Sequence, residues 1–349
     1  MSLLDLLKGF TTFNSGVGPH VVVGEDDFLF DRLVRLGISA EIIPIPEFRR
    51  IKHFFKRAPF VSRLAKICEQ RKIEIIHANN YRVAPWSALV AKEIGILSCC
   101  SIRTIIDARR ARKNLVFEND RVVAIAKAVQ QTLVSSAPGK ICQIYNGIEV
   151  PDFIEPDDNL LSRLKIPRLS GKRVGFMGAL TKHKGPQLLI EAIPRVLTEL
   201  PDTVFIFIGR SKQEFVEQLQ TRAEILGVAS NVVFTGALEF GARYLKILDL
   251  FVLPSLKEPL GRVTAEAMYA GLPVVGTNTG GTPEIVEHGR TGRLVPPGRP
   301  ELLAREILFY LKNDRIRKEH GDLARRRAAE LFDITTYARR IEELYMEMR

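Results

Sequence analysis

Glu258-Pro-Leu-Gly-Arg-Val-Thr-Ala-Glu-Ala-Met268 is the stretch that decides how this 349-residue chain is interpreted. A proline and a glycine interrupt regular structure early in it, and residues 263–270 then form a helical run. Glu258 is therefore expected on a loop, and Glu266 in an early turn of the helix. The backbone N–H groups near Gly261 would lie at the positive end of that helix, where an anion can bind. Two carboxylates flanking a phosphate-sized site suit a nucleotide-diphosphate sugar.

The chain continues with Gly271-Leu-Pro-Val-Val-Gly-Thr-Asn-Thr-Gly-Gly281-Thr-Pro-Glu-Ile-Val286, and both segments together resemble the E-x7-E donor-site motif of family 4 glycosyltransferases. Ten positions match in register: Glu258, Gly261, Glu266, Ala267, Met268, Gly271, Pro273, Gly280, Gly281 and Glu284. Two carboxylates at this spacing would be weak evidence alone, but ten matches are hard to attribute to chance. The resemblance implies retaining enzymes of α/β class with the GT-B fold, in which two Rossmann-like domains have a cleft between them.

The second half of the chain alternates apolar runs with helical patterns, which is typical of a parallel sheet covered on both faces. The expected strands are Arg173–Met177, Val204–Ile208, Asn231–Thr235, Leu250–Leu253 and Pro273–Gly276. The expected helices are Pro186–Leu200, Lys212–Leu226, Arg243–Lys246 and Val263–Ala270. Ligands of such sheets bind beyond the carboxyl ends of the strands, and Glu258 follows one of these runs.

The first half is less regular but of the same kind. Its expected strands are His20–Val23, Ile42–Ile45, Ile73–His77, Leu97–Ile102, Val122–Ile125 and Gln143–Tyr145. The segment 146–158, with two prolines and several acids, reads as a linker. We therefore expect domains at 1–150 and 151–334. By resemblance, the first is the acceptor-side domain, the second binds the nucleotide sugar, and a C-terminal helix at 335–349 returns to the first.

The N-terminus departs from the family pattern. Family members open with a strand and a Gly-rich loop on the acceptor side, and a helix follows. Here Leu3–Phe10 has the pattern of that helix, and His20–Val23 that of the next strand. The first strand and its loop are therefore expected to be missing, because the true start lies upstream or because part of the acceptor pocket is absent. Such a loss would expose a sheet edge.

Gly178-Ala-Leu-Thr-Lys-His-Lys184-Gly185 follows the first strand of the second half and resembles the family's G-R-L-x-x-x-K-G. In the family an Arg and a Lys of this segment hold the diphosphate through charge-assisted hydrogen bonds. The resemblance assigns Gly178, Lys184 and Gly185 to the donor site, but Ala179 replaces the Arg. Three residues could supply the missing charge: Lys182, Arg210 and Arg262.

The resemblance also implies roles for single residues. Glu266 would accept hydrogen bonds from the ribose hydroxyls, and Glu258 would contact the donor sugar. Catalysis is expected to involve Glu258, Lys184 and Arg103, the last standing where many family members have a His. An Arg can contact sugar or phosphate but cannot accept a proton. The remaining residues expected at the donor site are Arg210, Leu260, Gly261, Arg262, Val263, Gly280 and Gly281.

The composition limits the classes of binding partner that this chain is expected to have. The net charge of +11 favours nucleotide sugars, acidic lipid or nucleic acid, and the 8% aromatic content without a nucleic-acid motif disfavours the last. No acidic or His cluster has metal-ligand spacing, so neither a metal nor a cofactor beyond the nucleotide sugar is expected. Four cysteines without a pairing pattern favour the cytoplasm. His77 closes a strand and fits either a core or a functional role.

The run Phe48–Lys72 interleaves basic and apolar residues. It can lie on an anionic bilayer, which would make the protein peripheral on the inner face of the membrane, or form an ordinary half-buried helix. The expected function is transfer of a sugar to a glycan or lipid-linked acceptor, as in cell-envelope polysaccharide synthesis. One alternative is a catalytically impaired nucleotide- or partner-binding GT-B protein. Another is a basic nucleic-acid- or membrane-binding module.

Overall fold

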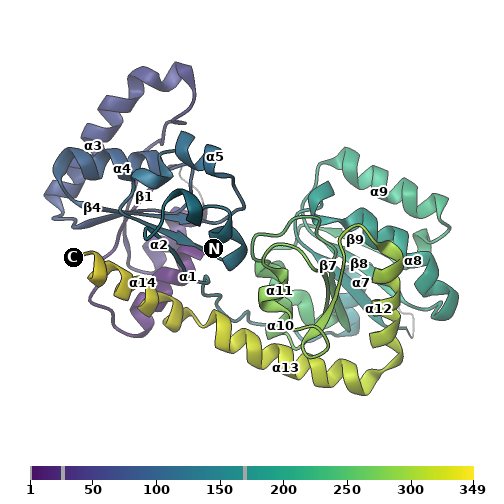
Figure 1. The fold of residues 1–349 in the computed structure, drawn as a ribbon. Helices are drawn as coiled ribbons and strands as arrows, with labels where there is room; N and C mark the ends of the chain where they lie inside the picture. The colour runs from purple at the N-terminus through teal and green to yellow at the C-terminus, as the bar shows by residue number, and fades with distance from the viewer. Residues whose placement is uncertain (1, 25–27, 168–170) are drawn as a thin grey trace. The chain divides into compact units, whose positions relative to one another are not determined.

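The computed structural model divides the chain into two compact units (Figure 1). Unit 1 comprises Met1–Glu149 and Phe332–Arg349, and unit 2 comprises Val150–Leu331. The structure describes residues 2–24, 28–167 and 171–349, with residues 51 and 52 described by their backbone alone. Within those ranges, no helix combines the length and the apolar character needed to cross a bilayer.

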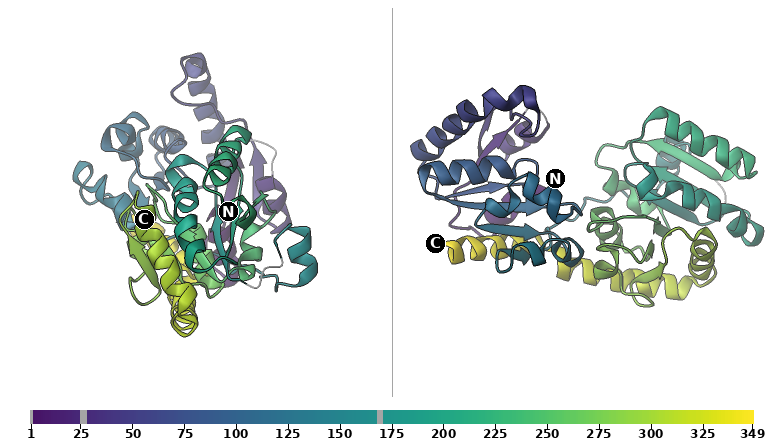
Figure 2. Two further views of the ribbon diagram at one scale, coloured as in Figure 1. Left: turned by 90° about the vertical axis from the view of Figure 1, so that its right-hand side faces the viewer. Right: turned by 45° about the horizontal axis from the view of Figure 1, so that its top comes forward.

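Unit 2 is built on one parallel sheet with the strand order β12-β11-β10-β7-β8-β9. Its strands are β7 (Arg173–Met177), β8 (Val204–Ile208), β9 (Val232–Gly236), β10 (Leu250–Leu253), β11 (Val274–Thr277) and β12 (Gly292–Val295). Every residue of β8 and β10 is buried, because helices cover both faces of the sheet (Figure 2). The longer helices are α8 (Pro186–Glu199), α9 (Gln213–Ile225), α10 (Arg262–Tyr269), α12 (Pro300–Lys312) and α13 (Asp314–Phe332), and the shorter ones are α7 (Asp158–Arg163) and α11 (Thr282–Ile285).

The order of the strands reverses between β7 and β10. From β7 the chain adds β8 and β9 on one side, and it then returns to the other side of β7 to add β10, β11 and β12. In open α/β sheets, ligands bind beyond the carboxyl ends of the strands at such a reversal. Because β7 and β10 are paired neighbours, the loops that follow Met177 and Leu253 lie beside each other.

Unit 1 contains two parallel sheets. One pairs β1 (His20–Val23) with β2 (Ser39–Ile42), and the other has the order β3-β4-β5-β6. The strands of the second sheet are β3 (Ile75–Ala78), β4 (Leu97–Ile102), β5 (Arg121–Ala124) and β6 (Ile141–Gln143). Within the described ranges β1 does not pair with β3, so the two sheets are separate.

Both sheets of unit 1 share two hydrophobic cores. On one side Val23 of β1 packs with α1 (Ser2–Thr12), α2 (Phe28–Arg35) and α14 (Ile334–Met348). On the other side Val22 packs with α3 (Arg57–Gln70) and α4 (Ala84–Ile94). A Cβ on Gly9 would lie 2.4 Å from the carbonyl oxygen of Ile334, so α1 and α14 approach through a glycine. The remaining helices are α5 (Ala108–Lys113) and α6 (Lys127–Gln131).

A half-buried polar network joins α14 to the second sheet of unit 1. The ring of His77 is hydrogen-bonded to the hydroxyl of Tyr345 at 2.5 Å and to that of Ser101 at 2.8 Å. Burial, followed by the positive charge of Arg103, lowers the pKa of His77 from 6.5 to about 3. His77 is therefore neutral at physiological pH, and both ring nitrogens are hydrogen-bonded within unit 1, as the structural interpretation expects.

Five strands, β1, β4, β7, β8 and β10, have the predicted bounds. The prediction of a strand at Ile42–Ile45 is wrong, since β2 ends at Ile42. Pro44 and Pro46 lack N–H groups and cannot continue a ladder. The predicted helix Arg243–Lys246 is a 3-10 helix, η6 (Gly241–Ile247). Strand β12 was missed because its four residues include a glycine and an arginine, which hide the apolar pattern.

Candidate functional site

Two loops of unit 2 meet at the reversal of strand order. The first contains η4 (Lys182–Lys184) and ends at Gly185, which precedes α8 with φ 76°. A Cβ on Gly185 would lie 2.0 Å from the carbonyl oxygen of Pro254, so the loops touch at a point that only glycine fits. The backbone N–H of Leu256 also donates to the carbonyl of His183 at 2.8 Å. The backbone therefore fixes the separation of the two loops.

An ion pair spans these loops. The ammonium group of Lys184 lies 2.7 Å from Oε2 and 3.0 Å from Oε1 of Glu258. The Glu258 side chain is 3% exposed, and the hydroxyl of Ser255 donates to it at 3.0 Å. A carboxylate this buried depends on such partners, because desolvation would otherwise disfavour its charge.

Ser255 is a residue that the sequence reasoning missed. It is fully buried and lies two residues beyond β10. Ligands of parallel sheets bind beyond the carboxyl ends of the strands, so this is a position where ligand-binding groups are expected. Its carbonyl accepts a hydrogen bond from the hydroxyl of Thr277 at 2.5 Å. The place of Ser255 directly after a buried strand is the sequence signal that could identify it as a site residue.

Gly280 and Gly281 support the backbone of the Glu258 loop. The N–H of Gly281 donates to the carbonyl of Glu258 at 2.9 Å. A Cβ on Gly280 would lie 1.8 Å from that carbonyl oxygen, and one on Gly281 would lie 2.4 Å from the carbonyl oxygen of Pro259. The two glycines thus let the segment after β11 pack directly against the loop that carries Glu258.

The helix α10 brings the second carboxylate to the same loop. Gly261 precedes it with φ 91°, a left-handed conformation that favours glycine. Nε of Arg262 donates to Oε1 of Glu266 at 2.8 Å, and the Glu266 side chain is 12% exposed. The N–H groups of the first turn lie at the positive end of the helix dipole. Of the other predicted residues here, Leu260 is buried and Val263 half-buried.

Gly178 and Arg210 follow the carboxyl ends of the neighbouring strands β7 and β8. The N–H of Gly178 donates to the carbonyl of Ile208 at 2.9 Å, and the N–H of Leu180 to that of Arg210 at 2.8 Å. A Cβ on Gly209 would lie 1.8 Å from the carbonyl oxygen of Gly178, so the loops after β7 and β8 also meet through glycine. The Arg210 side chain is exposed.

Arg103 belongs to unit 1, whereas Lys184 and Glu258 belong to unit 2. Its guanidinium donates to the carbonyl and side chain of Asn79, to the side chain of Asn146 at 2.6 Å, and to the hydroxyl of Tyr337. These bonds connect the ends of β3, β4 and β6 with α14. The structure thus gives Arg103 a structural role, and its predicted part in catalysis stays a prediction.

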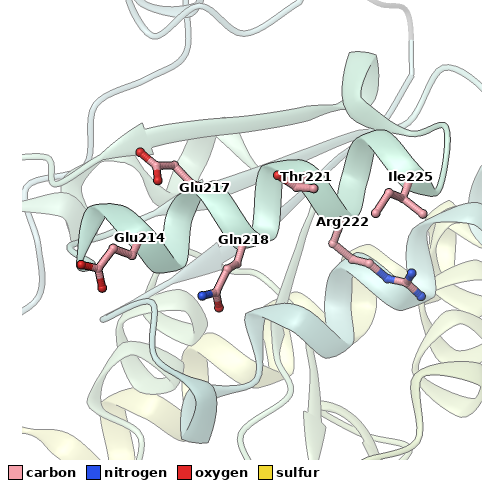
Figure 3. A pocket seen from close by; sticks show the side chains of 6 residues that line it. All are labelled: Glu214, Glu217, Gln218, Thr221, Arg222 and Ile225. Atoms are coloured by element: carbon pink, nitrogen blue, oxygen red, sulfur yellow. The ribbon is translucent and has the colours of Figure 1, made fainter.

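Two other features bear on where ligands could bind. No group of three or more His, Cys, Asp or Glu side chains gathers as a metal site within the described ranges. A hollow of about 470 Å³ lies along α9, lined by Glu214, Glu217, Gln218, Thr221, Arg222 and Ile225 (Figure 3). All six residues come from one helix, and none is a predicted site residue. The hollow is therefore separate from the site built around Glu258.

Two family models match the chain, one in each half. The family described as "Glycosyl transferases group 1" matches residues 165–327, and "Glycosyltransferase Family 4" matches residues 2–151. Spore coat protein SA of Bacillus subtilis is 30% identical over 66% of this chain and 65% of its own length. N-acetyl-alpha-D-glucosaminyl L-malate synthase of Bacillus anthracis is 25% identical over 82% of this chain and 78% of its own length. The chain thus spans just under two thirds of the first of these relatives.

Solved structures with the same fold cover almost the whole chain. HepE of Anabaena, in complex with UDP and glucose, superposes with a TM-score of 0.83 at 23% identity, over 99% of this chain and 95% of its own. A glycosyltransferase of Rickettsia africae superposes with a TM-score of 0.87 at 19% identity, over 99% of this chain and 94% of its own. At these identities the likeness establishes the fold.

The close approach of Gly281 to the Glu258 loop predicts the effect of one added methyl group. Gly281→Ala should destabilise unit 2 by about 1–3 kcal/mol, because its Cβ overlaps the backbone of Pro259 and Leu260. Urea unfolding followed by circular dichroism measures the change. Gly18→Ala is the control, since a Cβ there meets nothing within 4 Å. Equal unfolding midpoints for both variants would show that the glycine contact is not needed.

Proposed function

The chain belongs to family 4 of the glycosyltransferases and has their GT-B fold, and from this we propose that it transfers a sugar from a nucleotide-diphosphate sugar to an acceptor hydroxyl. The observation that carries the proposal is the Lys184–Glu258 ion pair, which lies where the strand order of unit 2 reverses. A cation, a buried carboxylate and a helix N-terminus there provide complementary groups for phosphate and for sugar hydroxyls.

Each part of the donor then has a partner in unit 2. An ammonium group has three N–H donors, and two of those of Lys184 go to Glu258, so the third suits a diphosphate oxygen. The first turn of α10 supplies the opposite side of the diphosphate. Glu266 accepts hydrogen bonds from the ribose hydroxyls, and Glu258, oriented by Ser255, contacts the hydroxyls of the sugar. The fixed loop backbone keeps these groups at the correct spacing.

We propose a retaining reaction in which no metal ion is needed. Charge develops on the diphosphate as the sugar leaves, and Lys184 together with the dipole of α10 stabilises it. The acceptor hydroxyl attacks from the same face, and the leaving phosphate takes its proton. Arg262 is paired with Glu266 and so also places a positive charge beside the site, where Ala179 replaces the Arg of the family motif.

The proposed acceptor is a glycan or a lipid-linked sugar on the cytoplasmic side of the membrane, as in cell-envelope polysaccharide synthesis. Uridine diphosphate is the first nucleotide to test, because the Anabaena neighbour was solved with UDP and glucose. The runner-up is a nucleotide-binding protein without transferase activity.

Activity is tested by incubating the protein with a panel of nucleotide sugars and glycan or polyprenyl-phosphate-linked acceptors, with excess EDTA. We expect transfer from one donor, with the anomeric configuration retained in the product, as determined by NMR. Activity that disappears with EDTA and returns with a divalent cation would contradict metal independence. Saturable nucleotide binding without transfer or hydrolysis of any donor would favour the runner-up.

The role of Glu266 is tested by isothermal titration with nucleoside diphosphates. Glu266→Gln should weaken binding about tenfold to a hundredfold, because a hydrogen bond to a charged group contributes about 1.5–3 kcal/mol. The matched control is Glu191→Gln, which removes another Arg-paired carboxylate of unit 2, held by Arg222 at 2.6 and 2.9 Å. If both variants bind as tightly as the unaltered protein, Glu266 does not contact the ribose.

A further inference from the structure

Two phenylalanines lie exposed at a tip of unit 1. They belong to η1 (Ile51–Lys56), which precedes α3, and Figures 1 and 2 show the α3 region projecting beyond the rest of the unit. Phe54 is 57% exposed and Phe55 87%. Their rings touch edge to face with centroids 5.7 Å apart, so they form one continuous apolar surface. Ala58 and Pro59, in the first turn of α3, are exposed beside them.

The apolar residues of α3 itself are used inside the protein. Phe60, Val61 and Leu64 are buried in a core with Trp86 of α4. The apolar face of α3 is therefore part of a core of unit 1, as in an ordinary half-buried helix. The apolar surface that remains for an external partner is the tip formed by Phe54 and Phe55.

Positive charge surrounds this tip. Residues 48–72 contain nine Lys and Arg against one acid, Glu69, and Glu47 just before them is ion-paired with Arg50 at 2.6 Å. The exposed basic residues of the tip and of the outer face of α3 are Arg49, Arg50, Lys56, Arg63 and Lys66. The guanidinium of Arg57 lies over the rings of Phe48 at 4.3 Å and Phe54 at 5.0 Å, which braces the tip against α3.

We propose that the tip inserts Phe54 and Phe55 into the surface of an anionic lipid bilayer. Aromatic rings at a protruding tip bury apolar area among lipid chains, while Lys56 and Arg63 remain among the phosphates. The charge argues against a second copy of this chain as the occupant, because two such tips would bring like charges together. The inference deepens the proposed function, since a lipid-linked acceptor is presented at such a surface, but docking itself requires no donor.

Sedimentation with vesicles tests the proposal on the full chain. We expect binding to vesicles of phosphatidylglycerol mixed with phosphatidylcholine, weakened by salt, and little binding to phosphatidylcholine alone. Phe54→Ser/Phe55→Ser should weaken binding to the anionic vesicles about tenfold or more, through lost apolar burial. Lys56→Glu/Arg63→Glu should also weaken it about tenfold or more.

Matched variants show whether vesicle binding depends on the tip itself or on any exposed phenylalanine or basic residue. Phe28→Ser removes a phenylalanine that is 54% exposed on α2, and Arg315→Glu/Lys318→Glu reverses two exposed charges on α13. Both controls should bind vesicles like the unaltered protein. Uridine diphosphate affinity and thermal unfolding should be the same in all these proteins, so loss of docking is distinguishable from loss of the donor site.

Several results would overturn the proposal. Unchanged vesicle binding in the Phe54→Ser/Phe55→Ser variant would, as would equal binding to neutral and anionic vesicles. Sedimentation velocity showing that the phenylalanines hold a dimer that does not bind lipid would identify a second copy as the partner. Displacement of the protein from vesicles by a single-stranded oligonucleotide, with the same dependence on Phe54 and Phe55, would identify nucleic acid.

Discussion

The ion pair between Lys184 and Glu258 is the interaction on which the donor site depends. It connects the loops after two neighbouring strands, β7 and β10, at the point where the strand order reverses. Glu258 depends on the pair, because a carboxylate that is 3% exposed needs a partner for its charge. Glycines set the distance across which the pair forms, since Gly185 touches Pro254 and Gly280 touches Glu258.

The glycines and the charges therefore act as one arrangement. The same motif could be explained as helix–strand packing alone, and packing is indeed what Gly280 and Gly281 do directly. That packing places Glu258 against Lys184 and starts α10 beside them, so the structural and the proposed functional roles of the glycines do not compete. In unit 1 a half-buried polar network of His77, Arg103 and the tyrosines of α14 adds to the two hydrophobic cores.

Sequence reasoning was strongest where the signal is local. The strands of unit 2 were predicted well because buried parallel strands are continuous apolar runs, and β8 and β10 were predicted to the residue. It failed at β2, where prolines end the strand early, and at β12, which is too short and too polar. Ser255 follows β10 closely enough for its position to indicate a role, whereas the bonds of Arg103 to Asn79 and Asn146 are long-range contacts that no local pattern encodes. The basic run showed the same limit, since its sequence could not separate the buried Phe60 from the exposed Phe55.

The most direct test of the central claim is a double-mutant cycle on uridine diphosphate affinity, with Lys184→Met, Glu258→Gln and both together. We predict that Lys184→Met weakens binding more when Glu258 is present than in the Glu258→Gln background, because an unpaired carboxylate repels the diphosphate. The coupling energy should be about 1 kcal/mol or more, with the folded state of each variant checked by urea unfolding. Strictly additive effects, or affinities unchanged in all three variants, would contradict the account.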